Sequence, residues 1–145
     1  MWPLCPNGLI VAALPERVEG ETTLKILLVD DQPVLLSAMR RMLSEHDCTT
    51  AQSASDALEI LAANDFDGIL CDLMMPGMDG AALHAVLIET RPDHAERMVF
   101  CTGGAASLRL QQFLDEEISR PVLNKPFDQL ELDTVVARWK SMQAE

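Results

Sequence analysis

Residues 68–80 read GILCDLMMPGMDG, and this stretch decides the fold. An apolar run of strand length ends on an acid, Asp72, and then breaks into a turn that contains Pro76 and Gly77. A short apolar run bounded by Pro and Gly is typical of a strand that is buried on both faces. The pattern therefore predicts a strand that delivers the Asp72 carboxylate to one edge of a sheet.

Three other segments of the chain have the same form. Residues 25–31 read KILLVDD, residues 97–104 read RMVFCTGG and residues 121–125 read PVLNK. Each is an apolar run that leads into a charged or hydroxyl side chain. In a parallel α/β sheet, functional side chains collect beyond the carboxyl ends of the strands. We therefore expect the polar ends of these four segments to meet in one crevice.

Helical patterns separate the strands along the chain. Pro33 lies in the first turn of one helix, Ser53 and Asp128 are N-cap residues of two others, and a fourth ends before Pro92. Regular alternation of β and α segments predicts a parallel sheet with helices on both faces. The expected fold is α/β and flavodoxin-like, a (βα)5 three-layer sandwich whose parallel five-stranded sheet has the order 2-1-3-4-5. The predicted strands are 25–30, 48–52, 67–72, 97–102 and 121–124, and the predicted helices are 33–45, one capped by Ser53, 81–90, 106–117 and one from 129.

Composition restricts the class of protein. A chain of 145 residues with 48% apolar residues is long enough for one domain with a real core. The net charge of −12 argues against a nucleic-acid partner, because phosphates would be repelled. The four cysteines lack C-x-x-C spacing and are expected to be free thiols, three of them buried in strands, as in a reducing cytoplasm.

The ends of the chain carry less information. Residues 1–23 form an N-terminal extension or linker, and residues 24–142 form the folded domain. The apolar stretch at 9–14 is too short to span a bilayer, and the N-terminus lacks the basic flank of a signal peptide. We therefore expect a cytoplasmic location without membrane contact. Only a helix follows Lys125, so the chain is expected to be a stand-alone domain or a piece of a larger protein.

The expected strand order makes Asp30, Asp31 and Asp72 neighbours. Carboxylates held close together repel one another unless protons or a cation intervene, and Mg²⁺ is a hard cation that takes oxygen ligands. With the Lys125 ammonium and the Thr102 hydroxyl, they form a site for moving a phosphoryl group onto a carboxylate. Taken singly, these residues have plainer interpretations as a solvated turn, a helix cap or a surface lysine. Their common position at strand ends favours the site.

Four motifs carry a resemblance to a known family. They are LVDD at 28–31, DLMMPGMDG at 72–80, TGG at 102–104 and NKPF at 124–127. Together they resemble the receiver domain of two-component response regulators over about residues 24–142. The resemblance implies that Asp72 accepts a phosphoryl group from a histidine of a sensor kinase or phosphotransfer protein. It also implies a signalling domain that switches conformation for a downstream partner, not a turnover enzyme.

The resemblance assigns a role to each acid of the site. It implies that Asp31, Asp72 and the main-chain carbonyl of Met74 bind Mg²⁺ directly. Asp30 acts mainly through water.

The resemblance also covers the residues that follow the last two strands. It implies that Thr102 bonds the phosphoryl oxygens, that Lys125 pairs with them, and that the peptide before Pro126 is cis. One position departs from the pattern. Val122 stands where receivers usually have Tyr or Phe on the last strand, which leaves the usual aromatic readout in doubt. The Thr-Gly-Gly motif is more similar to receivers of hybrid histidine kinases than to those of transcription factors.

Three alternatives share parts of this pattern. A flavin-binding module of the same fold needs a phosphate-binding loop after the first strand, where Asp30 and Asp31 would repel phosphate. A haloacid-dehalogenase-like phosphatase places a second acid two residues after its nucleophile, and here that residue is Met74. A receiver-like interaction domain without phosphorylation is the third. Homodimer formation is a further option that the sequence leaves open.

Overall fold

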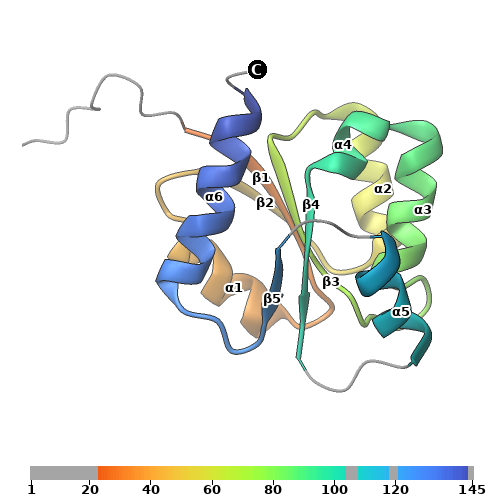
Figure 1. Ribbon diagram of the computed structural model, residues 1–145. Coiled ribbons are helices and arrows are strands. Elements are labelled where there is room, and N and C mark those ends of the chain that lie inside the picture. Colours follow the sequence, from red (N-terminus) through yellow and green to blue (C-terminus); the bar gives the residue numbers. More distant parts are fainter. Residues whose placement is uncertain (1–22, 104–107, 118–120, 144–145) are drawn as a thin grey trace, which may run out of the picture.

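The computed structural model describes residues 23–103, 108–117 and 121–143. Within these residues, five parallel strands form one sheet in the order β2-β1-β3-β4-β5, as Figure 1 shows. This confirms the predicted fold class and strand order. The strands are β1 (Lys25–Val29), β2 (Asp47–Ala51), β3 (Gly68–Asp72), β4 (Met98–Thr102) and β5 (Val122–Asn124).

Helices cover both faces of the sheet and give three layers (Figure 1). Side chains of β1 alternate between the two faces: Leu27 and Val29 belong to one core, and Ile26 and Leu28 to the other. Both sets are fully buried, as expected for a parallel sheet covered on both sides. The helices α2 (Ala54–Ala63), α3 (Gly80–Thr90) and α5 (Leu108–Glu117) pack on the first face, and α1 (Pro33–Met42) and α6 (Gln129–Gln143) pack on the second.

Local capping signals were predicted correctly. The Ser53 hydroxyl accepts a hydrogen bond from the Asp56 N–H at 3.0 Å at the start of α2. At the start of α6, Asp128 accepts from the Glu131 N–H at 2.8 Å and its own N–H donates to the Glu131 carboxylate at 2.9 Å. This reciprocal pair is a complete capping box, which satisfies two backbone N–H groups at the helix start.

Several element boundaries differ from the prediction. The short helix α4 (Pro92–Glu96) was not expected, because Pro92 was read only as the end of α3, whereas it also suits the first turn of a new helix. The first helix ends at Met42 rather than 45, since turn hydrogen bonds lead the chain into β2. Residues 106 and 107 of the predicted helix 106–117 lie outside the described residues.

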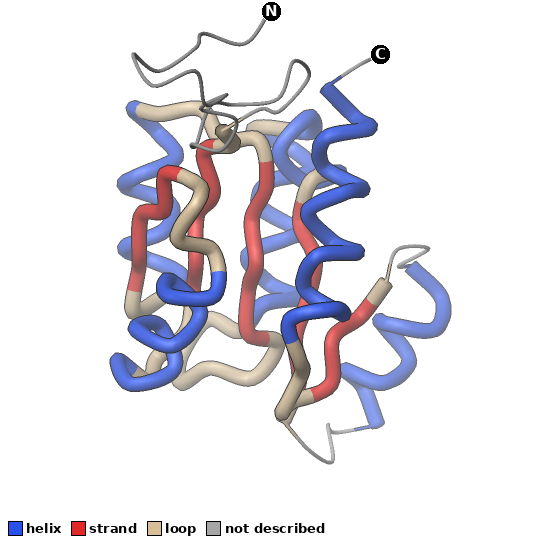
Figure 2. Tube along the Cα trace, turned by 90° about the vertical axis from the view of Figure 1, so that its left-hand side faces the viewer, coloured by secondary structure: helices blue, strands red, loops and turns tan. Residues whose placement is uncertain are grey.

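The two ends of the parallel strands carry different residues. We call the end of the sheet formed by the carboxyl termini of the strands the carboxyl edge, and the opposite end the amino edge. Helices lie on both sides of the sheet (Figure 2), and all five strands are parallel. Their carboxyl ends, with the loops that follow β1, β3, β4 and β5, lie at one edge. The polar residues singled out from the sequence therefore gather at this edge.

Candidate functional site

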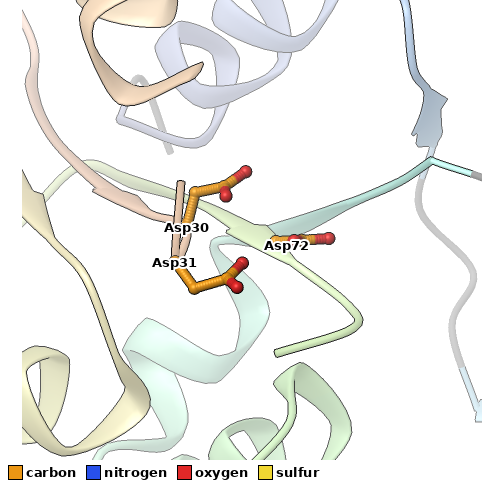
Figure 3. A group of neighbouring side chains, drawn as sticks. All are labelled: Asp30, Asp31 and Asp72. Carbon is orange, nitrogen blue, oxygen red and sulfur yellow. The ribbon is translucent and has the colours of Figure 1, made fainter. Parts of the chain in front are cut away.

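The three aspartates lie together at the carboxyl edge. Asp30 and Asp31 follow β1, and Asp72 is the last residue of β3, the neighbouring strand. One carboxylate oxygen from each lies within 4.8 Å of the others. Figure 3 shows the three side chains extending from adjacent strand ends toward the same side. The predicted cluster is thus present in the fold.

Lys125 reaches the same cluster from the loop after β5. Its Nζ donates a hydrogen bond to Asp30 Oδ2 at 2.8 Å and lies 3.4 Å from Asp72 Oδ2. Its backbone N–H bonds to the Thr102 carbonyl at 2.8 Å, which holds the ends of β4 and β5 together. The peptide bond between Lys125 and Pro126 is cis, as the sequence resemblance implied.

The three carboxylates do not have equivalent surroundings. Asp30 is fully buried, and its two oxygens accept hydrogen bonds from the Gln32 N–H at 2.9 Å and from Lys125. Asp72 is almost buried and accepts a longer bond of 3.3 Å from the Met74 N–H. Asp31 is half-buried, and toward the described residues it makes no hydrogen bond or ion pair. Asp31 and Asp72 therefore keep the most oxygen capacity for a ligand.

Electrostatics of the site favour a cation. Burial raises the pKa of the Asp72 carboxyl, Lys125 offsets part of this shift, and the charge on Asp30 raises the pKa further. Burial opposes the charge on Lys125, but its hydrogen bond to Asp30 and the nearby Asp72 carboxylate give it a raised pKa. Three carboxylates and one ammonium leave an excess of two negative charges. A divalent cation with oxygen ligands matches this excess and this donor set.

Thr102 contributes a hydroxyl that the described part of the protein leaves without a partner. It is the last residue of β4, only 7% exposed, and its Oγ1 has no hydrogen bond within the described residues. A buried hydroxyl without a partner costs free energy, so such groups in native proteins call for an explanation. At the edge of the acidic cluster, this hydroxyl is available to an anionic ligand.

A crevice of about 710 Å³ is lined by two residues of this site, Asp72 and Lys125, together with residues around them. One wall holds Asp72, Met74, Gly103 and Lys125. The other wall is largely apolar. It comes from α1 and the loop before α6, and its residues are Gln32, Leu35, Ala38, Met39, Met42, Pro126 and Phe127. The role of α1 in lining this crevice was not predicted from the sequence. No local signal indicated it, because an apolar helix face that lines a crevice has the same period as one that packs on a core.

Val122 is the residue at which the sequence departs from the pattern that it resembles. It is half-buried on β5, pairs with Phe100 of β4 and packs against the core on the α5 side. Its short aliphatic side chain offers neither a ring nor a hydroxyl. The Thr102 end of the site therefore lacks the usual aromatic neighbour on the last strand.

Comparison with known proteins identifies the family. Residues 26–137 match the response regulator receiver domain. The chain belongs to this family, whose members are signalling domains of two-component systems.

The similar proteins include regulators and a kinase. The chain is 34% identical over 116 residues to the response regulator protein FleR of Pseudomonas aeruginosa, covering 79% of this chain and 24% of FleR. It is 38% identical over 80 residues to the sensor histidine kinase RcsC of Escherichia coli, covering 49% of this chain and 8% of RcsC. The chain thus spans a quarter or less of these relatives.

A solved structure of similar shape comes from Pseudomonas fluorescens Pf-5. It is the signal receiver domain of an HD domain-containing protein, with a TM-score of 0.74, 28% identity, and coverage of 85% of this chain and 98% of that one. Family membership sets aside the flavin-binding and phosphatase alternatives. The receiver-like domain without phosphorylation is the alternative that an experiment must separate.

The structure also bears on the predicted state of the cysteines and on a membrane span. Cys48, Cys71 and Cys101 are free and buried, as predicted, while Cys5 lies outside the described residues. Burial raises the pKa of the Cys101 thiol to about 12, so this thiol stays protonated and unreactive. Among the described helices, none has both the length and the apolar character needed to cross a bilayer.

Proposed function

We propose that this domain is a phosphoacceptor in which Asp72 takes a phosphoryl group from a phosphohistidine. The supporting observation is the position of Asp72: its carboxylate lies close to those of Asp30 and Asp31 and to the Lys125 ammonium, and it lines a crevice. An Asp72 oxygen attacks phosphorus, the N–P bond of the phosphohistidine breaks, and its electron pair stays on the imidazole nitrogen. The product is an aspartyl phosphate and a free histidine.

Two residues stabilise the charge on the transferred group. The Lys125 ammonium, 3.4 Å from Asp72 Oδ2, is close enough to pair with a phosphoryl oxygen on that carboxylate. The Thr102 hydroxyl, without a partner among the described residues, would donate to a second oxygen. Both act by electrostatic stabilisation at fixed positions, the main contribution that proteins make to phosphoryl transfer.

We assign the Mg²⁺ ligands from the differences between the carboxylates. Asp31 and Asp72, together with the main-chain carbonyl of Met74, would hold the ion directly, because Asp30 already uses both oxygens for Gln32 and Lys125. Asp30 would act through water. When bound, Mg²⁺ supplies positive charge that offsets the carboxylates and the incoming phosphoryl oxygens.

The apolar wall of the crevice supports a protein donor. Leu35, Ala38 and Met42 on α1, with Phe127, lie next to the acceptor, and such a surface suits docking of a protein better than that of a free small phosphate. The donor would be a sensor histidine kinase or a histidine phosphotransfer protein. We also propose a cytoplasmic location, consistent with the buried free thiols, and a domain extending over residues 24–142.

Intact mass after incubation with acetyl phosphate and Mg²⁺ tests this function. The unaltered protein should gain one phosphoryl group, only when Mg²⁺ is present, and Asp72→Ala should gain none. Asp133→Asn, an exposed change of equal charge on α6, is the matched control and should react normally. If the unaltered protein reacts neither with acetyl phosphate nor with a phosphorylated histidine phosphotransfer protein, it is an interaction domain. If Asp72→Ala still reacts, the acceptor is another residue.

A further inference from the structure

The loop after the acceptor strand is tied to a distant helix. The Gly80 N–H bonds to the Leu73 carbonyl at 3.0 Å and closes this loop. Asp79 then caps α3, because its Oδ1 accepts from the Ala82 N–H at 2.8 Å. The second Asp79 oxygen, Oδ2, accepts from Arg109 Nη2 of α5 at 2.5 Å. One carboxylate thus holds the start of α3 and the first turn of the described part of α5.

This ion pair differs from an ordinary surface pair in its acidic partner. The Asp79 side chain is only 17% exposed and is already held in place by its capping bond, whereas Arg109 is 68% exposed. A held carboxylate loses less side-chain entropy on pairing than a free one. The contact therefore depends mainly on where α5 places Arg109.

A second contact joins the same elements below the surface. A Cβ on Gly80 would lie 2.8 Å from the Asp72 carbonyl and 3.1 Å from the Phe100 ring, so the start of α3 is in close contact with both. The Phe100 ring on β4 packs edge-on against Phe113 of α5, with ring centroids 5.5 Å apart. His84 of α3 packs against both rings, at 5.8 Å and 5.6 Å. Helix α5 is thus connected to Asp72 through α3 and to the Thr102 strand through Phe100.

We propose that the Asp79–Arg109 pair is a positioning contact that links the conformation of α5 to occupancy of the Asp72 site. Val122 has no ring or hydroxyl that could respond to a movement of Thr102. The contacts of α5 with α3 and Phe100 therefore connect this helix to the Asp72 site. The inference rests on the proposed function, because it requires a phosphoryl group or its mimic at Asp72.

Linkage determines the direction of the effect. If site occupancy favours the position of α5 in which Arg109 pairs with Asp79, occupancy strengthens the ion pair by some factor. Loss of the pair must then weaken binding at the site by that same factor. An exposed ion pair contributes up to about 1 kcal/mol, which corresponds to about two- to fivefold in affinity. Binding weakens because the ligand must then order the loop and α5 that the pair held in place.

The variants separate contact from charge. Asp79→Asn keeps the oxygen that caps α3 but removes the ion pair, and Arg109→Gln removes it from the other side. By charge alone, the first variant would strengthen binding of an anion and the second would weaken it. Loss of the contact makes both weaken binding. Arg109→Lys keeps the charge and should restore part of the affinity, and Arg40→Gln, an exposed change on α1, is the control.

The probe is beryllofluoride, a phosphoryl mimic, titrated by calorimetry at saturating Mg²⁺, so that only binding of the anion is measured. We expect Asp79→Asn and Arg109→Gln each to lower its affinity two- to fivefold, and the double variant to lose no more than either single one. Hydrogen exchange should show that the mimic protects residues 108–116 in the unaltered protein and protects them less in both single variants.

The possible outcomes separate failure of this inference from failure of the proposed phosphoacceptor function. Opposite shifts in the two single variants, unchanged affinity, or exchange in 108–116 that ignores the mimic would overturn the inference while leaving the phosphoacceptor function intact. Absence of beryllofluoride binding in the unaltered protein would remove both.

Discussion

The two edges of the sheet both carry charged side chains, but in different balance. At the carboxyl edge, Lys125 faces more carboxylates than it can neutralise. At the amino edge, Arg91 pairs with Asp65, and Arg97 lies 3.8 Å from Asp93. Each arginine there has one carboxylate, so positive and negative charges match.

Hydrogen bonding shows the same contrast. At the amino edge, His94 is fully buried, yet its Nε2 accepts from the Phe66 N–H at 3.0 Å and its Nδ1 lies 3.1 Å from Asp93 Oδ2. Because Nε2 accepts a hydrogen bond, the ring proton is on Nδ1 and can be donated to Asp93. At the carboxyl edge, the buried Thr102 hydroxyl has no partner among the described residues.

A polar cluster indicates function when its charges or hydrogen bonds are left unbalanced, not merely when it is rich in charge. Both clusters are rich in charge, so charge alone does not separate them. The amino-edge cluster is balanced and bonded, and it stabilises the fold. Within the described residues, the carboxyl-edge cluster keeps an excess of negative charge and a hydroxyl without a hydrogen-bond partner, and a ligand would satisfy both. Substitutions at the two edges should therefore differ in sign and size.

The largest effect should come from Gly68→Ala at the amino edge. An added Cβ would lie 2.2 Å from the Trp139 ring, which is fully buried and donates its Nε1–H to the Arg97 carbonyl at 2.8 Å. We expect a loss of about 3 kcal/mol in the free energy of unfolding, measured in urea. Trp139→Val removes the ring that the added Cβ would meet. The double variant should therefore lose less stability than the sum of the losses in the two single variants. Additive losses would show that the ring is not the obstacle.

Removing the imidazole at the amino edge should cost less. In His94→Leu the buried Phe66 N–H loses its acceptor, and we expect about 2 kcal/mol lower stability. His94→Gln, whose amide oxygen can accept that bond, should lose less. Mg²⁺ affinity should stay unchanged in both variants, because the cluster is far from the acids in the fold. A change in Mg²⁺ affinity would contradict the separation of the two edges.

Removing charge at the carboxyl edge should have the opposite sign. Asp72→Asn relieves repulsion among the carboxylates, and we expect it to raise stability without Mg²⁺ by about 1 kcal/mol at pH 7. Asp72 is a better choice than Asp30 for this test, because Asp30 would also lose its charge-assisted bond to Lys125. Asp133→Asn on the surface is the control. Lower stability of Asp72→Asn would show that Lys125 already balances the cluster.

The stability change in Asp72→Asn should depend on pH. Because the folded-state pKa of Asp72 is raised from 3.8, the folded protein holds this proton to higher pH than the unfolded chain does. The contribution of Asp72 is therefore most favourable at low pH and is lost as the pH rises through its folded-state pKa. The stability gain of Asp72→Asn should shrink when urea unfolding is repeated from pH 7 down to about pH 4. A gain independent of pH would point to a cause other than this carboxyl.

The smallest effect should come from Gly103→Ala beside the site. Among the described residues its Cβ would meet only the flexible Lys125 side chain, at 3.4 Å, so we expect stability to change by less than about 0.5 kcal/mol. Compared with Gly68→Ala, this variant tests whether the carboxyl edge is the open one. A loss as large as that at Gly68 would contradict the contrast.

Much of the candidate site follows from short sequence patterns. An apolar run that ends on Asp31, Asp72 or Thr102 defines a strand and places its last side chain at the carboxyl edge, because all strands of a parallel sheet point the same way. The apolar patterns of α3 and α5 likewise predicted helices. The ion pair between Asp79 and Arg109 had no such signal, since nothing local indicates which two residues 30 positions apart will meet.

The sequence by itself determined the strands and the main helices, because hydrophobic period and capping act over a few neighbouring residues. Topology rules for parallel α/β sheets then gave the strand order and the gathering of acids at one edge. Only the tertiary structure decided that Lys125 bonds to Asp30, that Asp31 has no hydrogen bond or ion pair within the described residues, and that α1 lines the crevice. These outcomes depend on side-chain directions and distances between segments far apart in the chain. They are set by how the helices pack on the finished sheet.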